Sequence, residues 1–166
     1  MEKNYFWSNP LKKSGHENEN YFFFLSSVPI FDSLTRRQID KLQRIIHIRN
    51  FSKDEIVFRQ GDPGVGLYIV KDGSVDVYNE LNDMTCHKIT TLNHGDFFGE
   101  TSLLNETPRS ATIISAEQSV LWGLFKPDLL NLFDSDPKLG LRLIFRLSQI
   151  VAERLRLLNN SLCGIQ

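Results

Sequence analysis

The 166-residue sequence has few of the features that define several large classes of protein. It contains only two cysteines, Cys86 and Cys163, which cannot form a disulfide framework and indicate a reducing compartment. The formal net charge of −1 provides no basic excess for nucleic acid. The longest apolar run near the start, Tyr21 to Leu25, is too short for a membrane span or a signal sequence. These absences favour a cytoplasmic protein that binds neither membranes nor nucleic acid.

Constellations typical of metal sites and of catalysis are also missing. The four histidines, at positions 16, 47, 87 and 94, do not have the spacing of zinc ligands. His94 lies beside a glycine and an aspartate, but no nucleophile accompanies it. The run Gly64-Val65-Gly66 lacks the Gly-Lys-Ser/Thr ending of a phosphate loop and is expected to be a turn. We therefore expect no metal site, no cofactor and no enzyme activity.

The length suits one domain. Residues 1–20 are polar and have no hydrophobic periodicity, so we expect a flexible N-terminal arm, followed by a single domain over residues 21–166. Apolar residues then recur at helical spacing between Tyr21 and Ile48, which predicts helices in this segment. The pair Asp32-Ser33 precedes the first of the periodic residues and is a candidate helix start.

Short strand-like runs, separated by glycine-bearing turns, fill the middle of the chain. The expected strands are Glu55–Phe58, Leu67–Val70, Val75–Tyr78, His87–Leu92, Thr112–Ile114 and Ser119–Leu124. Strands of this length at regular spacing indicate a β-sandwich or a jelly-roll barrel. The sequence thus predicts an α+β fold.

The last third of the chain is again helical. We expect a short helix over Asp128–Phe133, and a second helix that begins with Asp136 as its N-cap and Pro137 at its first position. Leucine, isoleucine and valine residues repeat every three or four positions from Leu143 to Leu158, so one face of this long helix packs against the barrel.

The most informative stretch runs from Gly95 to Thr112. Two glycines permit a sharp turn and close approach to a ligand, and a short helical run over Glu100–Asn105 follows at once. The free amides at the start of a helix attract anions. Nine residues after Glu100 comes Arg109, whose planar guanidinium suits phosphate oxygens. These features predict a phosphate-binding site.

Glu100 indicates what else the ligand contains. A carboxylate accepts hydrogen bonds without donating them, so beside a phosphate it must face another part of the ligand. Its natural partner is a sugar hydroxyl, as in dinucleotide sites where an acidic residue binds the ribose. A nucleotide that carries a single phosphate satisfies both requirements.

At these residues the sequence resembles the cyclic nucleotide-binding domain family, which includes Crp/Fnr-like regulators and regulatory subunits of protein kinase A. The family's phosphate-binding cassette matches Phe98-Gly99-Glu100 together with Pro108-Arg109-Ser110-Ala111-Thr112, and departs from the family pattern at Thr101 and Ser102. The resemblance covers residues 25–160. It implies a double-stranded β-helix, or jelly-roll, barrel with N-terminal helices, a short cassette helix and a long C-terminal helix.

The resemblance also assigns roles to individual residues. It implies that Glu100 binds the ribose, and that the cyclic phosphate is bound by Gly99, Thr101, Ser102, Arg109, Ser110 and Ala111. It places the base against Val77, Thr90 and Leu92 of the barrel, with Leu158 and Asn159 of the last helix nearby. Serine at position 110, as in the bacterial activator that binds cyclic AMP, favours cyclic AMP over cyclic GMP.

The resemblance implies a regulatory sensor whose C-terminal helix responds to the ligand, acting through a protein partner or as a homodimer formed by that helix. Two alternatives remain open at this point. One is a truncated or DNA-independent relative of a Crp/Fnr-type transcription regulator, since too few residues follow the long helix for a helix-turn-helix. The other is a scaffold on the same fold that binds no ligand.

Overall fold

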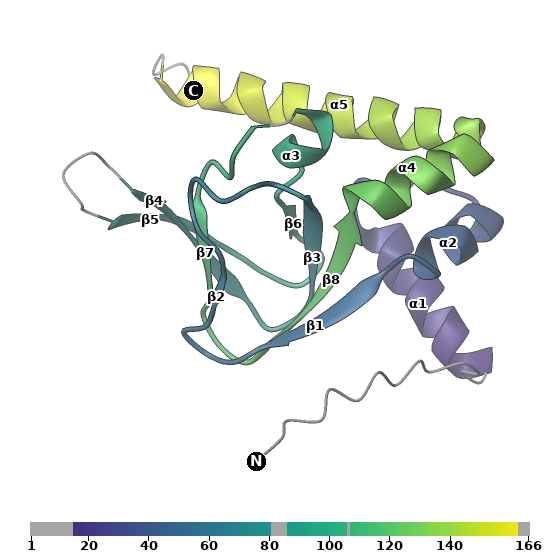
Figure 1. Ribbon diagram of the computed structural model, residues 1–166, viewed down its shortest axis with the longest axis horizontal. Helices are drawn as coiled ribbons and strands as arrows, with labels where there is room; N and C mark the ends of the chain where they lie inside the picture. The colour runs from purple at the N-terminus through teal and green to yellow at the C-terminus, as the bar shows by residue number, and fades with distance from the viewer. Residues whose placement is uncertain (1–14, 81–85, 106, 163–166) are drawn as a thin grey trace.

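The computed structural model describes residues 15–80, 86–105 and 107–162, and Figure 1 shows their arrangement. The elements follow in the order α1 (Gly15–Ser27), α2 (Arg36–Gln43), β1 (His47–Phe51), β2 (Ile56–Phe58), β3 (Gly66–Asp72), β4 (Val75–Glu80), β5 (Cys86–Leu92), β6 (Phe97–Phe98), α3 (Thr101–Leu104), β7 (Thr112–Ser115), β8 (Ser119–Phe125), α4 (Lys126–Ser135) and α5 (Pro137–Leu162).

The strands form two four-stranded antiparallel sheets. One has the order β1-β8-β3-β6 and the other has the order β2-β7-β4-β5. The sheets face one another as a barrel, which confirms the predicted α+β jelly roll. In Figure 1, α1, α2 and α4 gather on one side of this barrel, and α5 runs past α3 along another side.

The two central strands of the first sheet, β3 and β8, are buried on both of their faces, and this determines their composition. Along β3, Leu67 and Ile69 pack with the helices, whereas Val70 packs inside the barrel. Along β8, Trp122 faces the helices and Leu121 faces the interior. Strands buried on both faces are near-continuous apolar runs. This explains why β3 and β8 could be predicted from the sequence.

Aromatic contacts attach α1 to this sheet. Tyr21 stacks on Trp122 with ring centroids 4.5 Å apart, and Phe24 meets the same indole edge-on at 4.9 Å. The Lys71 ammonium lies 4.5 Å from the centroid of the Phe24 ring, at a distance typical of a cation–π contact. The N-terminal helix is therefore part of the domain, and residues 15–20 of the expected arm belong to α1. The rest of the expected arm lies outside the described residues.

The start of α5 follows the predicted capping. The Leu139 amide donates to Asp136 Oδ1 at 3.1 Å, and Pro137 occupies the first helical position. Lys41 Nζ of α2 lies 2.6 Å from Asp136 Oδ2. The hydrogen bond from Lys41, followed by the one from the Leu139 amide, lowers the pKa of the Asp136 carboxyl below its ordinary value. These contacts tie α2 to the junction between α4 and α5.

Two strands were not expected from the sequence. The segment predicted as helix between Tyr21 and Ile48 instead ends in β1, whose residues His47 to Asn50 are all exposed and which pairs with β8. An edge strand exposed on both faces has no alternating pattern. The second missed strand, β6, is two residues long and is held by its pairing with β3.

The two adjacent leucines of α4 give a matched test of the packing. Leu129 is 5% exposed and Leu130 is 51% exposed. We expect Leu129→Ala to lower the free energy of unfolding by about 2–4 kcal/mol, because it leaves a cavity in the core. Leu130→Ala should change it by less than about 0.5 kcal/mol. Denaturant titration followed by circular dichroism measures both values, and equal losses would contradict the assigned orientation of α4.

Candidate functional site

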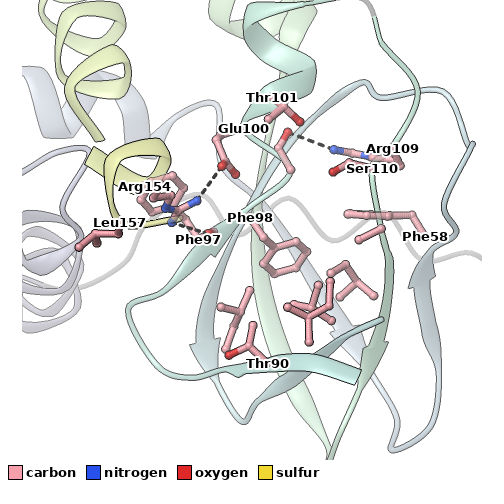
Figure 2. A pocket seen from close by; sticks show the side chains of 16 residues that line it. Phe58, Thr90, Phe97, Phe98, Glu100, Thr101, Arg109, Ser110, Arg154 and Leu157 are labelled. Carbon is pink, nitrogen blue, oxygen red and sulfur yellow. Dashed lines mark hydrogen bonds and ion pairs between the residues drawn. The ribbon is translucent and has the colours of Figure 1, made fainter. Parts of the chain in front are cut away.

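A cavity of about 570 Å³ opens where the second sheet, the β6–α3 turn and α5 meet (Figure 2). Charged and polar groups gather at the turn and apolar side chains cover the strands. The residues that line it are Phe58, Val77, Ile89, Thr90, Leu92, Phe97, Phe98, Gly99, Glu100, Thr101, Arg109, Ser110, Ala111, Ile113, Arg154 and Leu157.

Arg109 is the buried cation of this cavity, with only 5% of its surface exposed. Its Nη1 donates to the carbonyl oxygens of Gly66 (2.7 Å) and Gly99 (3.1 Å) and to Ser102 Oγ (3.3 Å). The guanidinium carbon lies 4.0 Å from the centroid of the Phe58 ring. The protein therefore fixes Nη1 through hydrogen bonds, and the guanidinium lies over the ring of Phe58.

A second nitrogen of Arg109 has no partner in the described residues. Its Nε is buried and makes no hydrogen bond there. Burial lowers the pKa of Arg109, and this is opposed in part by Tyr68, Asp62 and Glu100. An arginine stays charged despite such a shift. A buried cation with an unsatisfied donor beside a cavity is costly unless an anion completes its hydrogen bonds.

Two backbone positions beside Arg109 must be glycine, because a side chain there would collide with neighbouring atoms. Gly99 has a φ of +78°, and a Cβ at this position would lie 2.4 Å from Arg109 Nη1. A Cβ at Gly66 would lie 2.3 Å from the carbonyl oxygen of Leu124. The two carbonyls that hold Arg109 thus come from positions where a side chain has no room.

The cassette helix α3 is a single turn. Its first hydrogen bond within the turn runs from the Leu103 amide to the Glu100 carbonyl at 3.0 Å, so the amides before Leu103 do not take part in the helix. Thr101 lies on the cavity wall, whereas Ser102 is buried behind Arg109 and does not line the cavity. Ser110 and Ala111, which follow Arg109 in the chain, also line the cavity.

Glu100 is 8% exposed and is already engaged by α5. Its Oε1 accepts a hydrogen bond of 2.6 Å from Arg154 Nη1 (Figure 2). Arg154 Nη2 lies 3.4 Å from the Phe97 carbonyl oxygen, and its guanidinium carbon lies 4.7 Å from the centroid of the Phe97 ring. This contact was not expected from the sequence, although Arg154 follows Ile150 by one helical turn on the face of α5 that meets the barrel.

The apolar wall is larger than the sequence predicted. Val77, Thr90 and Leu92 line the cavity, and Val77 pairs with Thr90 across β4 and β5. The register shifts just beyond that pair, because Tyr78 pairs with Lys88. Ile89 is therefore the extra residue of a bulge and lines the cavity next to Thr90, which strict alternation would not allow.

One residue of the last helix that was not predicted reaches the cavity. Leu157 lines the cavity, whereas Asn159 is exposed and does not. The side chain of Leu158 lies outside the described part of the structure. Besides Ile89, Arg154 and Leu157, the sequence analysis missed four hydrophobic lining residues, which are Phe58, Phe97, Phe98 and Ile113.

Within residues 15–80, 86–105 and 107–162, no three histidine, cysteine, aspartate or glutamate side chains are grouped to hold a metal ion. No helix in these ranges has the length and apolar character needed to span a bilayer.

A sequence model of the cyclic nucleotide-binding domain matches residues 48–136, which is more than half of the chain. The chain belongs to the cyclic nucleotide-binding domain family. The match includes the whole stretch from Gly99 to Ala111, part of which lines the cavity. The β-barrel and the helices around it are the fold of this family.

Similar proteins include kinase components and a bacterial regulator. The cGMP-dependent protein kinase of Plasmodium berghei is 45% identical over 100 residues, which cover 60% of this chain and 11% of the kinase. The cAMP-dependent protein kinase regulatory subunit of Dictyostelium discoideum is 38% identical over 103 residues, covering 57% of this chain and 30% of that subunit. The chain thus matches less than a third of either relative's length.

Among solved structures, the catabolite activator protein of Thermus thermophilus superposes with a TM-score of 0.74 at 30% identity. The superposition covers 82% of this chain and 62% of the activator.

Two glycines with positive φ test how tightly Arg109 is enclosed. Gly95 has a φ of +88° and open space where a Cβ would point, with no atom within 4 Å, whereas Gly99 is crowded by Arg109. Both alanine variants strain the backbone, by about 1–2 kcal/mol. We expect Gly99→Ala to lower the free energy of unfolding by about 1.5–3 kcal/mol more than Gly95→Ala does, because the new methyl group displaces the charge-assisted hydrogen bonds of Arg109. Urea titration measures the difference, and equal losses would show that Arg109 moves away freely.

Proposed function

We propose that this regulatory domain is a sensor that binds cyclic AMP in preference to cyclic GMP and passes the signal on through α5. The observation that carries the proposal is the buried Arg109, whose Nε is unpaired in the described structure and whose surroundings open to the cavity. A cyclic phosphate supplies the anion that this group requires, and guanidinium–phosphate contacts are short and strong.

The arrangement of the cavity supports the same ligand at its sugar and phosphate ends. Gly99, Thr101, Ser110 and Ala111 surround the end of the cavity at Arg109, where the phosphate would bind. Ser102 would act from behind, through its contact with Arg109 Nη1. Glu100 lies between this end and α5, and its carboxylate suits a ribose hydroxyl because it accepts without donating.

The base end of the cavity favours adenine. Val77, Ile89, Leu92 and Ile113 present apolar side chains, and Thr90 supplies a hydroxyl. Guanine carries more polar groups on its edge than adenine does, so more polar groups would face these apolar side chains. Leu157 of α5 lies at the same cavity and would contact the base, the role that the sequence analysis gave to Leu158 and Asn159.

For the output, α5 carries a second apolar face. Leu141, Phe145 and Leu155 are 71%, 62% and 58% exposed, and together with Ser148, Ala152 and Asn159 they repeat in alternating steps of four and three residues. This is the spacing of a two-stranded coiled coil, in which a polar residue at one core position can fix the register of the two helices. A second copy of this chain is the partner that the repeat fits best.

A cyclic nucleotide regulatory domain acts by binding, and no catalytic group is part of the proposal. A ligand-free scaffold is disfavoured, because a cavity with no function would not retain a buried arginine with an unsatisfied donor. A cytoplasmic location stays a prediction of the sequence.

Arg109→Ala tests the ligand assignment. We expect the variant to fold, as judged by circular dichroism, but to lose about 2–5 kcal/mol of binding free energy for cyclic AMP, because the phosphate loses its charged partner. Isothermal titration calorimetry measures the affinity. Arg59→Ala, at an exposed arginine outside the cavity, is the control and should bind as the wild type does. Wild-type affinity in Arg109→Ala would rule out the proposed site.

Phe145→Arg tests the coiled-coil face. A charge at this position would be buried between the two helices, so we expect the variant to sediment as a monomer where the wild type forms a dimer. Gln149→Arg places the same charge on an exposed position of α5 outside the heptad repeat and should remain dimeric. Analytical ultracentrifugation measures both, and a wild-type protein that is monomeric with and without cyclic AMP would refute the dimer.

A further inference from the structure

A second hollow lies away from the ligand cavity, between α5 and the residues that lead into α2. Its volume is about 610 Å³, similar to that of the ligand cavity. One wall comes from the segment before α2 and the other from α5, and the lining residues are Asp32, Ser33, Arg142, Phe145, Arg146 and Gln149. None of them lines the ligand cavity, so the function proposed above gives this hollow no ligand.

The two arginines of the hollow differ in what surrounds their charge. Arg146 is neutralised, because its Nη2 pairs with Asp32 Oδ2 and its Nε donates to Asp32 Oδ1 at 3.1 Å and to the Pro29 carbonyl oxygen at 3.0 Å. Arg142 instead donates from Nη1 to the neutral Gln38 Oε1 at 3.2 Å. Among the described residues, no carboxylate lies within ion-pair distance of Arg142, so its positive charge is oriented but not balanced.

The positive charge continues from the hollow onto α2. Arg37, Lys41 and Arg44 are spaced four and three residues apart, so they lie along one side of this helix and its C-cap. All three are exposed. Lys41 pairs with Asp136 at the start of α5, whereas neither Arg37 nor Arg44 has a carboxylate partner in the part of the chain that the structure describes.

The hollow and this side of α2 form one basic surface, which we call the α2–α5 surface. Its basic residues are Arg37, Lys41, Arg44, Lys138, Arg142 and Arg146, and its acidic residues are Asp32, Asp40 and Asp136. The formal net charge of the whole chain is −1, so the basic excess here is local. A local excess of positive charge attracts an anionic partner.

We propose that the α2–α5 surface docks an acidic segment of a partner protein, with one carboxylate of that segment bound to Arg142 in the hollow. A guanidinium binds a carboxylate through two parallel hydrogen bonds, and among the described residues only Nη1 of Arg142 is engaged. Further carboxylates of the segment pair with Arg37 and Arg44. This docking goes beyond the sensor function and needs neither a cyclic nucleotide nor a dimer.

Two features favour a peptide over a membrane or a nucleic acid. The hollow is concave and lies between two elements, whereas a bilayer surface is flat and would contact protruding side chains. Asp32, Asp40 and Asp136 interrupt the basic residues, so the closely spaced phosphates of a nucleic acid would meet negative charge. The carboxylates of a peptide can be spaced to avoid these aspartates. Phe145 also lines the hollow, but it belongs to the repeat proposed for the dimer, so the proposal rests on the arginines.

The first experiment selects random peptides, displayed on phage, for binding to the immobilised full chain. We expect the enriched peptides to be rich in aspartate and glutamate, because the surface is complementary to negative charge. An enriched peptide is then synthesised with a fluorescein label, and its fluorescence anisotropy is measured as the protein is added. Its affinity should fall as the salt concentration rises, because exposed charges are screened.

Arg142→Glu tests whether the hollow binds the peptide. It should weaken binding about tenfold or more, because an attraction becomes a repulsion. Arg49→Glu makes the same change of charge at an exposed position of β1 outside the hollow, and should weaken binding by no more than about twofold. Both variants should keep the wild-type circular dichroism spectrum and the wild-type affinity for cyclic AMP, because neither residue lines the ligand cavity.

Equal losses in Arg142→Glu and Arg49→Glu would overturn the proposal, because the overall charge would then explain the binding. Enrichment of basic or uncharged peptides, or of none, would overturn it too. The same proteins are tested with vesicles of phosphatidylcholine and phosphatidylserine and with duplex DNA. If either of these binds through Arg142 and no peptide does, the proposed partner is wrong. Failure of the wild type to bind cyclic AMP would contradict the sensor function alone and leave the peptide result unaffected.

Discussion

Burial of one arginine is the constraint on which the rest of the site depends. The side chain of Arg109 is held by two backbone carbonyls, and its own backbone pairs with the loop before β3 through Gly61 and Asp62, both at 2.9 Å. A buried cation is tolerated only when polar groups surround it closely. Gly66 and Gly99 permit this close packing, because neither position has room for a side chain. The need to surround a buried charge therefore accounts for these two glycines and for how near their backbone lies to Arg109.

The long helix α5 connects this site with the rest of the molecule. Its N-terminal half packs in the main core through Leu139, Leu143 and Leu147, and Arg154 and Leu157 then reach the cavity. The opposite face is the exposed heptad repeat. A shift of the C-terminal half of α5 would therefore alter the cavity and the exposed face at once. Coupling of this kind needs no further element, since both surfaces belong to one continuous helix.

The sequence predicted the parts of the structure that depend on local chemistry. Glycine turns, the Asp136 cap and doubly buried strands leave direct signatures, and the spacing from Glu100 to Arg109 indicated two residues that the structure brings together at one cavity. It did not predict β1, which has no buried face, or Ile89, which enters the cavity through a bulge. Nor did it predict Arg154, because pairing over 54 residues depends on where α5 docks, and docking is a property of the packed core.

The charges around the cavity account for the kind of anion that the site suits. Two cationic side chains, Arg109 and Arg154, and one anionic side chain, Glu100, are the ionised groups among the described lining residues, so their net charge is +1. A cyclic phosphate diester carries a single negative charge and would neutralise them, whereas a nucleoside triphosphate would leave several negative charges without a cationic partner at the cavity. Unpaired charge is penalised most where water is excluded. The charges of Arg109, Glu100 and Arg154 are thus compatible with the singly charged ligand proposed above.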